Sequence, residues 1–184
     1  MIYLYMLAAG FYSASEAGVG CWFVNYMSES FYMGAEERAL YASLFFLLKT
    51  IGLVFGGFVI RYLGYFRTVL FYAVAAAALT SAGTALGKSG LLLIVLAGLA
   101  FSSIYPTILS TIPSSFGKET SQATGLIMMS SSLTAMLSTL LIGLLNDFIG
   151  TRPAFFIVPL CLAFVAITSR FIQKSSQKTQ NSDR

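Results

Sequence analysis

Two charged side chains, Glu16 and Lys49, each interrupt a long apolar stretch of the chain, over residues 1–28 and 39–60. An ionisable side chain near the centre of a bilayer costs ~2.5–3.5 kcal/mol on insertion scales, so it normally faces protein or a water-filled cavity. If the two stretches are antiparallel neighbouring helices, the two charges lie at the same depth within about two turns and can meet. The pair then has two interpretations. Either Glu16 binds a proton or the substrate while Lys49 adjusts how readily it does so, or the two form a structural pair that neutralises both charges.

An aromatic ring and an amide, Trp22 and Asn25, follow Gly18 and Gly20 in the first apolar stretch. Two glycines so close together loosen a helix, and broken helices near the membrane midplane are where transporters expose backbone to a substrate. Trp22 would offer a flat face to a ring-shaped ligand, and Asn25 would offer both a hydrogen-bond donor and an acceptor. The alternative is that Trp22 is an interfacial anchor near the outer membrane surface. The sequence leaves both open.

A patch of hydroxyl groups surrounds a proline further along the chain: Ser102, Ser103, Tyr105, Pro106 and Thr107. Pro106 removes a backbone donor and can kink a helix, which leaves a carbonyl group free to face a cavity. Ser103, Tyr105 and Thr107 are therefore candidates to line a cavity for a neutral polar ligand. The alternative is that the serine and threonine hydroxyls satisfy the freed backbone groups locally.

The missing residue types exclude several kinds of chemistry. With no His and only two Cys, Cys21 and Cys161, the chain offers neither an imidazole base nor a His metal site, and it lacks a disulfide framework. We expect no metal, no cofactor and no catalysis, since paired catalytic carboxylates are also missing. The net charge is +4, but the basic residues are dispersed, so nucleic acid is not an expected partner.

The elements that hold these residues are predicted to be membrane-spanning helices. Hydrophobic residues make up 57% of the 184 residues and the mean hydropathy is +0.80. Charged residues make up 10%, against roughly 25% in a soluble domain. A spanning helix needs ~20 apolar residues, and the apolar stretches predict an all-α integral membrane protein with spans at about 1–27, 39–60, 67–87, 90–114, 120–145 and 153–172. The polar segment 173–184 is predicted to be a disordered cytoplasmic tail.

Six spans place both termini on one side of the membrane. Seven basic residues are predicted on that side: Arg61, Arg67, Lys118, Arg170, Lys174, Lys178 and Arg184. Three are predicted on the other side: Arg38, Lys88 and Arg152. The positive-inside rule therefore predicts a multi-pass protein of the cell membrane with both termini in the cytoplasm.

Two loops of the chain share one skeleton, a glycine, a charged residue, a second glycine and then an arginine. The first comprises Gly57, Arg61, Gly64 and Arg67, and the second, 86 residues later, comprises Gly143, Asp147, Gly150 and Arg152. Glycine suits a tight helix–loop–helix, and charges are stabilised at helix ends by the helix dipole. The matched pair indicates two inverted three-helix repeats. The alternative is that any short hairpin between spans collects glycine and arginine.

These loops resemble a hallmark of the major facilitator superfamily, G-x-x-x-D-[RK]-x-G-[RK]-[RK], although Arg61 stands where the motif has Asp. Residues 12–26 resemble the seventh helix of the fucose/glucose-type sugar:proton symporters, and residues 98–106 resemble their tenth helix. Leu53 stands where that type is expected to carry Arg. The resemblance extends from residue 1 to about 172.

The resemblance implies that the chain is the C-terminal six-helix half of a twelve-helix transporter. It implies secondary active transport of a small polar solute such as a sugar, coupled to protons. The expected partners are that solute, the lipid bilayer and a second six-helix half, which is either a missing N-terminal half or another chain. The chain would then be a fragment, a truncated gene product or a half-size subunit. The alternative from a different class is a non-transporting adaptor of the same fold that binds other membrane proteins.

Overall fold

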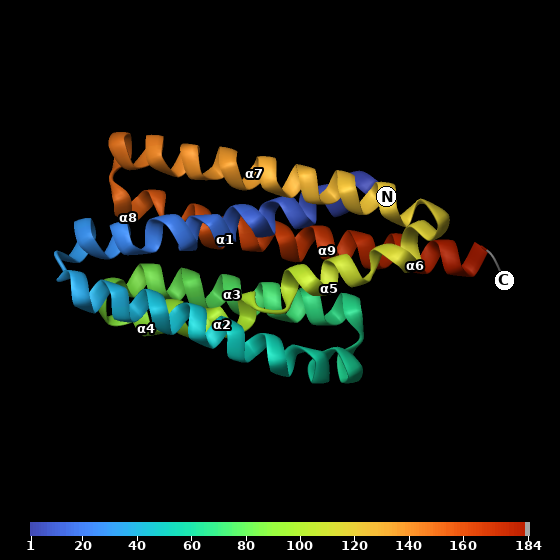
Figure 1. Ribbon diagram of the computed structural model, residues 1–184, viewed down its shortest axis with the longest axis horizontal. Helices are drawn as coiled ribbons and strands as arrows, with labels where there is room; N and C mark the ends of the chain where they lie inside the picture. Colours follow the sequence, from blue (N-terminus) through green and yellow to red (C-terminus); the bar gives the residue numbers. More distant parts are fainter. Residues whose placement is uncertain (183–184) are drawn as a thin grey trace.

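Helices form nearly all of the computed structural model, which describes residues 1–182, with side chains as far as Gln173. They run side by side along an elongated bundle (Figure 1). Their bounds are α1 (Ile2–Phe31), α2 (Ala35–Leu63), α3 (Tyr65–Leu86), α4 (Leu91–Phe101), α5 (Ile104–Ser110), α6 (Ile112–Phe116), α7 (Thr120–Ile149), α8 (Thr151–Ala154) and α9 (Ile157–Ser182). Short 3₁₀ turns at Gly87–Gly90 and Gly117–Glu119 connect α3 to α4 and α6 to α7.

The predicted span at 90–114 is divided into three helices, α4, α5 and α6. The first break falls at Ser102 and Ser103, and the second falls at Thr111. Proline explains both positions, because Pro106 and Pro113 lie near the starts of α5 and α6 and have no N–H to donate to the preceding turn. The kink expected from Pro106 is therefore present as a break in this segment.

The chain runs back and forth along the length of the bundle, and both termini lie at the same end (Figure 1). The turn from α2 to α3 lies at that end, while the turn from α1 to α2 lies at the opposite end. The last helix, α9, runs past the predicted end of its span at 172 and continues to Ser182. Its helical backbone over 173–182 differs from the disordered tail predicted for 173–184, and residues 183–184 lie outside the described part.

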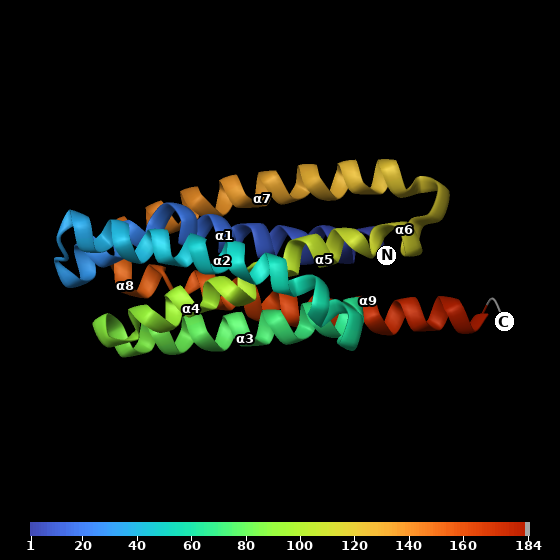
Figure 2. The ribbon, with the colours of Figure 1, turned by 60° about the horizontal axis from the view of Figure 1, so that its bottom comes forward.

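The helices pack in two connected groups. α1 contacts both α7 and α9, and α4 contacts both α2 and α3 (Figure 2). Contacts between α3 and α9 join the groups. Aromatic side chains fill much of the interior, and the largest fully buried ones are Tyr5, Tyr12, Phe23, Tyr26, Phe45, Phe101 and Phe155. Tyr26 stacks on Phe155 with ring centroids 4.5 Å apart, which fixes the C-terminal part of α1 against the turn between α8 and α9.

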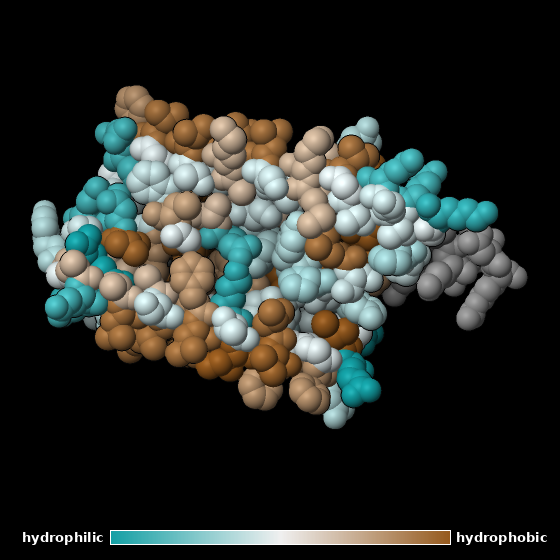
Figure 3. Space-filling view, viewed as in Figure 1, coloured by the Kyte–Doolittle hydropathy of each residue, from teal (hydrophilic) through white to brown (hydrophobic). Residues whose placement is uncertain are grey.

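The surface of the bundle is largely apolar along the helices. Large apolar side chains are exposed along α2 and α7, such as Val54 and Phe58 on α2 and Met129 and Leu140 on α7. On the face drawn in Figure 3, hydrophilic residues gather at the two ends of the molecule, and a small hydrophilic patch lies near the middle. Three helical stretches of the described chain, 35–63, 65–149 and 151–173, are apolar and long enough to cross a membrane, and the middle one contains several helices.

Candidate functional site

Glu16 and Lys49 form an ion pair between α1 and α2. The contact predicted from their depths is therefore confirmed. The Glu16 side chain keeps 36% of its surface exposed and the Lys49 side chain keeps 24%. The pair therefore lies at the edge of the contact between α1 and α2, called the α1–α2 seam below, and is open on one side. Each charge is held near the middle of a long helix, where a bilayer would otherwise penalise it.

An aromatic residue lies one turn before each of the two charges. Tyr12 lies one turn before Glu16 on α1, and its hydroxyl donates to the Phe101 carbonyl at 2.8 Å. Its ring stacks on the half-buried Tyr105 of α5, with centroids 5.7 Å apart. Phe46, one turn before Lys49 on α2, is 47% exposed. Sequence reasoning missed Tyr12 and Phe46, although their spacing of one turn from each charge is the signal that places them on the same face.

Glycine allows α2 to approach α4 closely in the region that carries Lys49. A Cβ atom at Gly52 would lie 2.6 Å from Ser102 Oγ and 2.7 Å from the Leu99 carbonyl oxygen, and a Cβ at Gly98 would meet the backbone of Phe45. Only a residue without a side chain fits at such distances. The backbone of α2 on both sides of Lys49 is thereby fixed against α4.

Ser103 and Thr107 are buried in helix packing, with 2% and 0% of their surface exposed. The Thr107 hydroxyl donates to the Ser103 carbonyl, and the Ser102 hydroxyl donates to the Leu99 carbonyl at 2.7 Å. These bonds satisfy carbonyl groups around the break before α5. Of the three candidates on this segment, Ser103 and Thr107 are buried and Tyr105 is the one that is partly exposed.

Trp22 of α1 is half-buried and packs against α7. Its indole N–H donates to the Thr139 carbonyl at 3.2 Å, and its ring lies against Gly143, where a Cβ would be 3.1 Å from Trp22 Cζ2. The loosening expected from Gly18 and Gly20 is absent, since α1 is unbroken from Ile2 to Phe31. Gly18 instead permits close packing, because its Cβ would lie 2.8 Å from Val158 of α9. Asn25 is half-buried on the same helix.

The two matched loops end their helices in the same way. Gly64 follows α2 with φ 75° and ψ 163°, and Gly150 follows α7 with φ 87° and ψ 161°. Each backbone N–H donates to the carbonyl four residues earlier, at Ile60 or Asn146. A positive φ is strained for residues with a side chain, so the shared glycines have one structural cause.

The remaining loop-motif residues have different environments. Gly57 and Gly143 lie inside α2 and α7, and Arg61, Arg67 and Asp147 are exposed near helix ends. Arg152 of α8 donates from Nη2 to the Ala85 carbonyl at 3.2 Å. That carbonyl belongs to the last turn of α3, where a cation is stabilised by the helix dipole.

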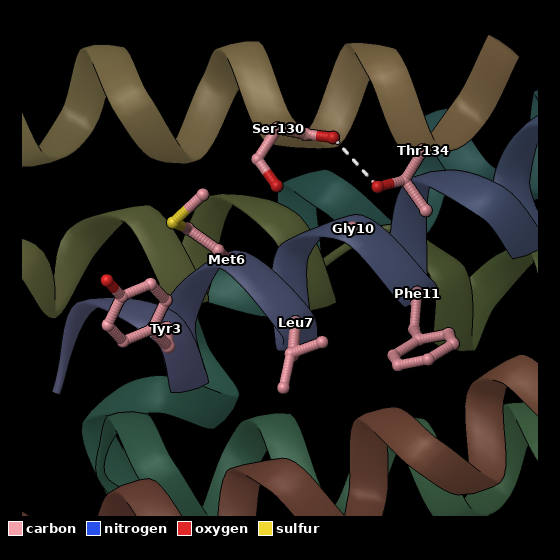
Figure 4. Close-up of a pocket in the computed structure, with 7 residues that line it drawn as sticks. All are labelled: Tyr3, Met6, Leu7, Gly10, Phe11, Ser130 and Thr134. Atoms are coloured by element: carbon pink, nitrogen blue, oxygen red, sulfur yellow. Dashed lines mark hydrogen bonds between the residues drawn. The ribbon is translucent and has the colours of Figure 1, made fainter. Parts of the chain in front are cut away.

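Cavities elsewhere in the described chain are mostly apolar or lie at its ends. One cavity of about 270 Å³ lies between α1 and α7, where Ser130 and Thr134 of α7 lie opposite Gly10 of α1 (Figure 4). Another of about 330 Å³ lies near Met1 and Glu119. In residues 1–182 no group of three or more His, Cys, Asp or Glu side chains is arranged to hold a metal ion.

Residues 5–184 match the family model of the Major Facilitator Superfamily. This chain belongs to that superfamily. Its members are membrane carriers and not enzymes, so the chain is a membrane protein of a transporter family. The resemblance drawn from the two loops is confirmed.

Similar proteins of this superfamily include sugar carriers. The glucose/galactose transporter of Brucella abortus biovar 1 (strain 9-941) is 28% identical over 169 residues, which are 89% of this chain and 40% of that protein. FucP in its outward conformation, a fucose:proton symporter of E. coli, is 25% identical. It superposes with a TM-score of 0.85 over 92% of this chain and 42% of its own.

The fold is shared more widely. PepTSo, a transporter of the POT family, superposes with a TM-score of 0.79 at 17% identity, over 94% of this chain and 37% of its own. The chain thus spans about two fifths of the length of the carriers that it matches.

Proposed function

We propose that this chain forms one six-helix half of a secondary transporter that moves a small polar solute, in the first instance a sugar, together with protons. The observation that carries the proposal is the Glu16–Lys49 pair, held at mid-helix on a partly open seam of a superfamily fold. The two kinds of similar protein with a sugar in their names, a glucose/galactose transporter and a fucose:proton symporter, support the choice of solute and of coupling ion.

The packing pattern supports two inverted three-helix repeats, the first formed by α1 to α3 and the second by α4 to α9. α1 contacts α7 while α2 contacts α4, so the first helix of each repeat meets the second helix of the other. Likewise, α1 contacts α9 while α4 contacts α3. Inverted repeats are related by a two-fold axis in the membrane plane, and such an axis would exchange the α1–α7 contact with the α4–α2 contact. It would also exchange the helix caps at Gly64 and Gly150, which end the second helix of each repeat.

A second half is required because transport by this architecture depends on one half rocking against another around a midplane site. Exposed apolar faces on α2 and α7 flank the seam that carries the ion pair and are available to contact that half. The basic residues near the end that holds both termini favour a cytoplasmic position for that end.

Proton coupling follows from the position of Glu16. A carboxylate that is half open and paired with an ammonium group can take up a proton when the two move apart, because it then loses its compensating charge. If rocking changes the Glu16–Lys49 separation, proton binding and solute access change together. The Glu16–Lys49 pair would then be the element that links the two fluxes.

The test compares two variants in the complete transporter that contains this half. Glu16→Gln should abolish sugar accumulation driven by a pH gradient but leave downhill exchange, which needs no net proton transfer. Lys49→Ala leaves a carboxylate unpaired inside the membrane and should also lower the amount of folded protein. An equal loss of membrane expression in both variants would make the pair structural, and normal pH-driven accumulation by Glu16→Gln would place the proton site elsewhere.

A further inference from the structure

We infer that the Glu16–Lys49 pair determines the charge class of the solute: it favours an uncharged polyhydroxyl compound and discriminates against both cationic and anionic analogues. This inference rests on the proposed function and concerns the same site. It assigns to the two side chains a role in specificity that is separate from proton coupling, since it depends on the charge of the solute and not on pH.

The first observation is the placement of the charges. In the described chain Glu16 and Lys49 are the charged residues near the middle of a predicted span, and the others lie near span ends or in turns. They compensate each other, so the seam carries no net charge at its centre. A solute that approaches the Glu16–Lys49 pair meets a carboxylate and an ammonium group together. The electric field of the pair is therefore that of a dipole and not that of a single charge.

The second observation is that both side chains remain partly open, at 36% for Glu16 and 24% for Lys49. A solute hydroxyl can donate to the carboxylate or accept from the ammonium group without separating the pair. A charged solute can gain its full interaction only by displacing one partner, which leaves the other charge uncompensated in a region of low dielectric. The pair therefore penalises either sign of solute charge.

The third observation is the apolar surface beside the pair. The Phe46 ring is 47% exposed, and Gly20 is exposed on the facing side of α1, with its Cβ position 4.0 Å from Phe46 Cζ. Exposed carbon surface next to a few polar groups suits a compact ring with hydroxyl substituents better than a strongly hydrated ion. Charge compensation and the adjoining apolar surface thus favour the same class of solute.

Removing one partner should change the preference in a direction set by the charge that remains. In Lys49→Met the free carboxylate should favour a cationic sugar, and in Glu16→Gln the free ammonium group should favour an anionic one. The exchanged variant Glu16→Lys/Lys49→Glu restores a compensated pair and should again prefer the uncharged sugar. Ser132→Ala is the matched control, because Ser132 is exposed on α7 and its hydroxyl bonds to its own helix at Met128.

The experiment measures inhibition of labelled glucose exchange by unlabelled glucose, glucosamine and glucuronate in vesicles that contain the complete transporter. We expect Lys49→Met to shift the glucosamine-to-glucose inhibition ratio at least about tenfold toward glucosamine, and Glu16→Gln to shift the glucuronate ratio similarly toward glucuronate. If the wild type exchanges glucose and both single variants show unshifted inhibition ratios, the inference is overturned and the proposed function stands. If one single variant does not fold, the other single variant and the exchanged variant decide the test. Unshifted inhibition ratios in the remaining single variant overturn the inference. A preference of the exchanged variant for a charged sugar also overturns it. No exchange of any sugar by the wild type overturns the proposed function with it.

Discussion

Replacing Gly52 with alanine tests the close approach of α2 to α4 that fixes the backbone around Lys49. The new methyl group would lie 2.6 Å from Ser102 Oγ, 2.7 Å from the Leu99 carbonyl oxygen and 3.0 Å from Leu99 Cα, where ordinary contacts begin at 3.4 Å. The Ser102 side chain can rotate, but Leu99 is in contact through its backbone, so the two helices have to separate. Such overpacking costs about 1–3 kcal/mol, and the gain from replacing a helical glycine offsets about 0.5–1 kcal/mol of it.

The expected result is a net loss of about 1 kcal/mol, and at most about 2.5 kcal/mol, in the free energy of unfolding, or a melting temperature lower by roughly 2–4 °C and at most about 10 °C. Thermal unfolding of the purified protein in detergent measures it. Gly57→Ala is the control, because it lies on the same helix with nothing within 4 Å of its Cβ position, and it should raise stability by about 0.5–1 kcal/mol. Changes of the same sign in the two variants would refute the packing argument.

Two further predictions concern the orientation in the membrane and the proposed second half. Cysteine introduced at Ser30 should react with an impermeant thiol reagent in intact cells whereas cysteine at Lys118 should not, and the reverse pattern would invert the orientation. The isolated 184-residue chain should transport no solute as a monomer, and in crosslinking it should be either unstable or self-associated through the exposed faces of α2 and α7. Saturable uptake by verified monomers would contradict that prediction.

The lengths of the apolar stretches and the placement of charges predicted much of the helix arrangement because those signals are local. The apolar stretches located the long helices. The contact between Glu16 and Lys49 was also predictable, since consecutive antiparallel helices place equal depths side by side.

Which side of each helix faces a neighbour was not predictable from the sequence. Trp22 bonds to Thr139, 117 residues away, and nothing near Trp22 in the chain specifies that partner. Likewise, Ser103 and Thr107 form a polar patch in sequence, yet α2 covers Ser103 through Gly56 and both side chains are buried. Helix rotation depends on long-range packing, so a stripe of hydroxyls cannot by itself distinguish a cavity from an interface.

The central claim is that this chain supplies half of a carrier, and counterflow measures carrier activity directly. Vesicles that contain this chain together with its second half are loaded with unlabelled glucose and diluted into a trace of labelled glucose. We predict a transient accumulation of label above the external concentration, which should be absent from vesicles that contain the 184-residue chain alone. A complete assembly that folds but shows no transient accumulation with glucose, galactose or fucose would contradict the account.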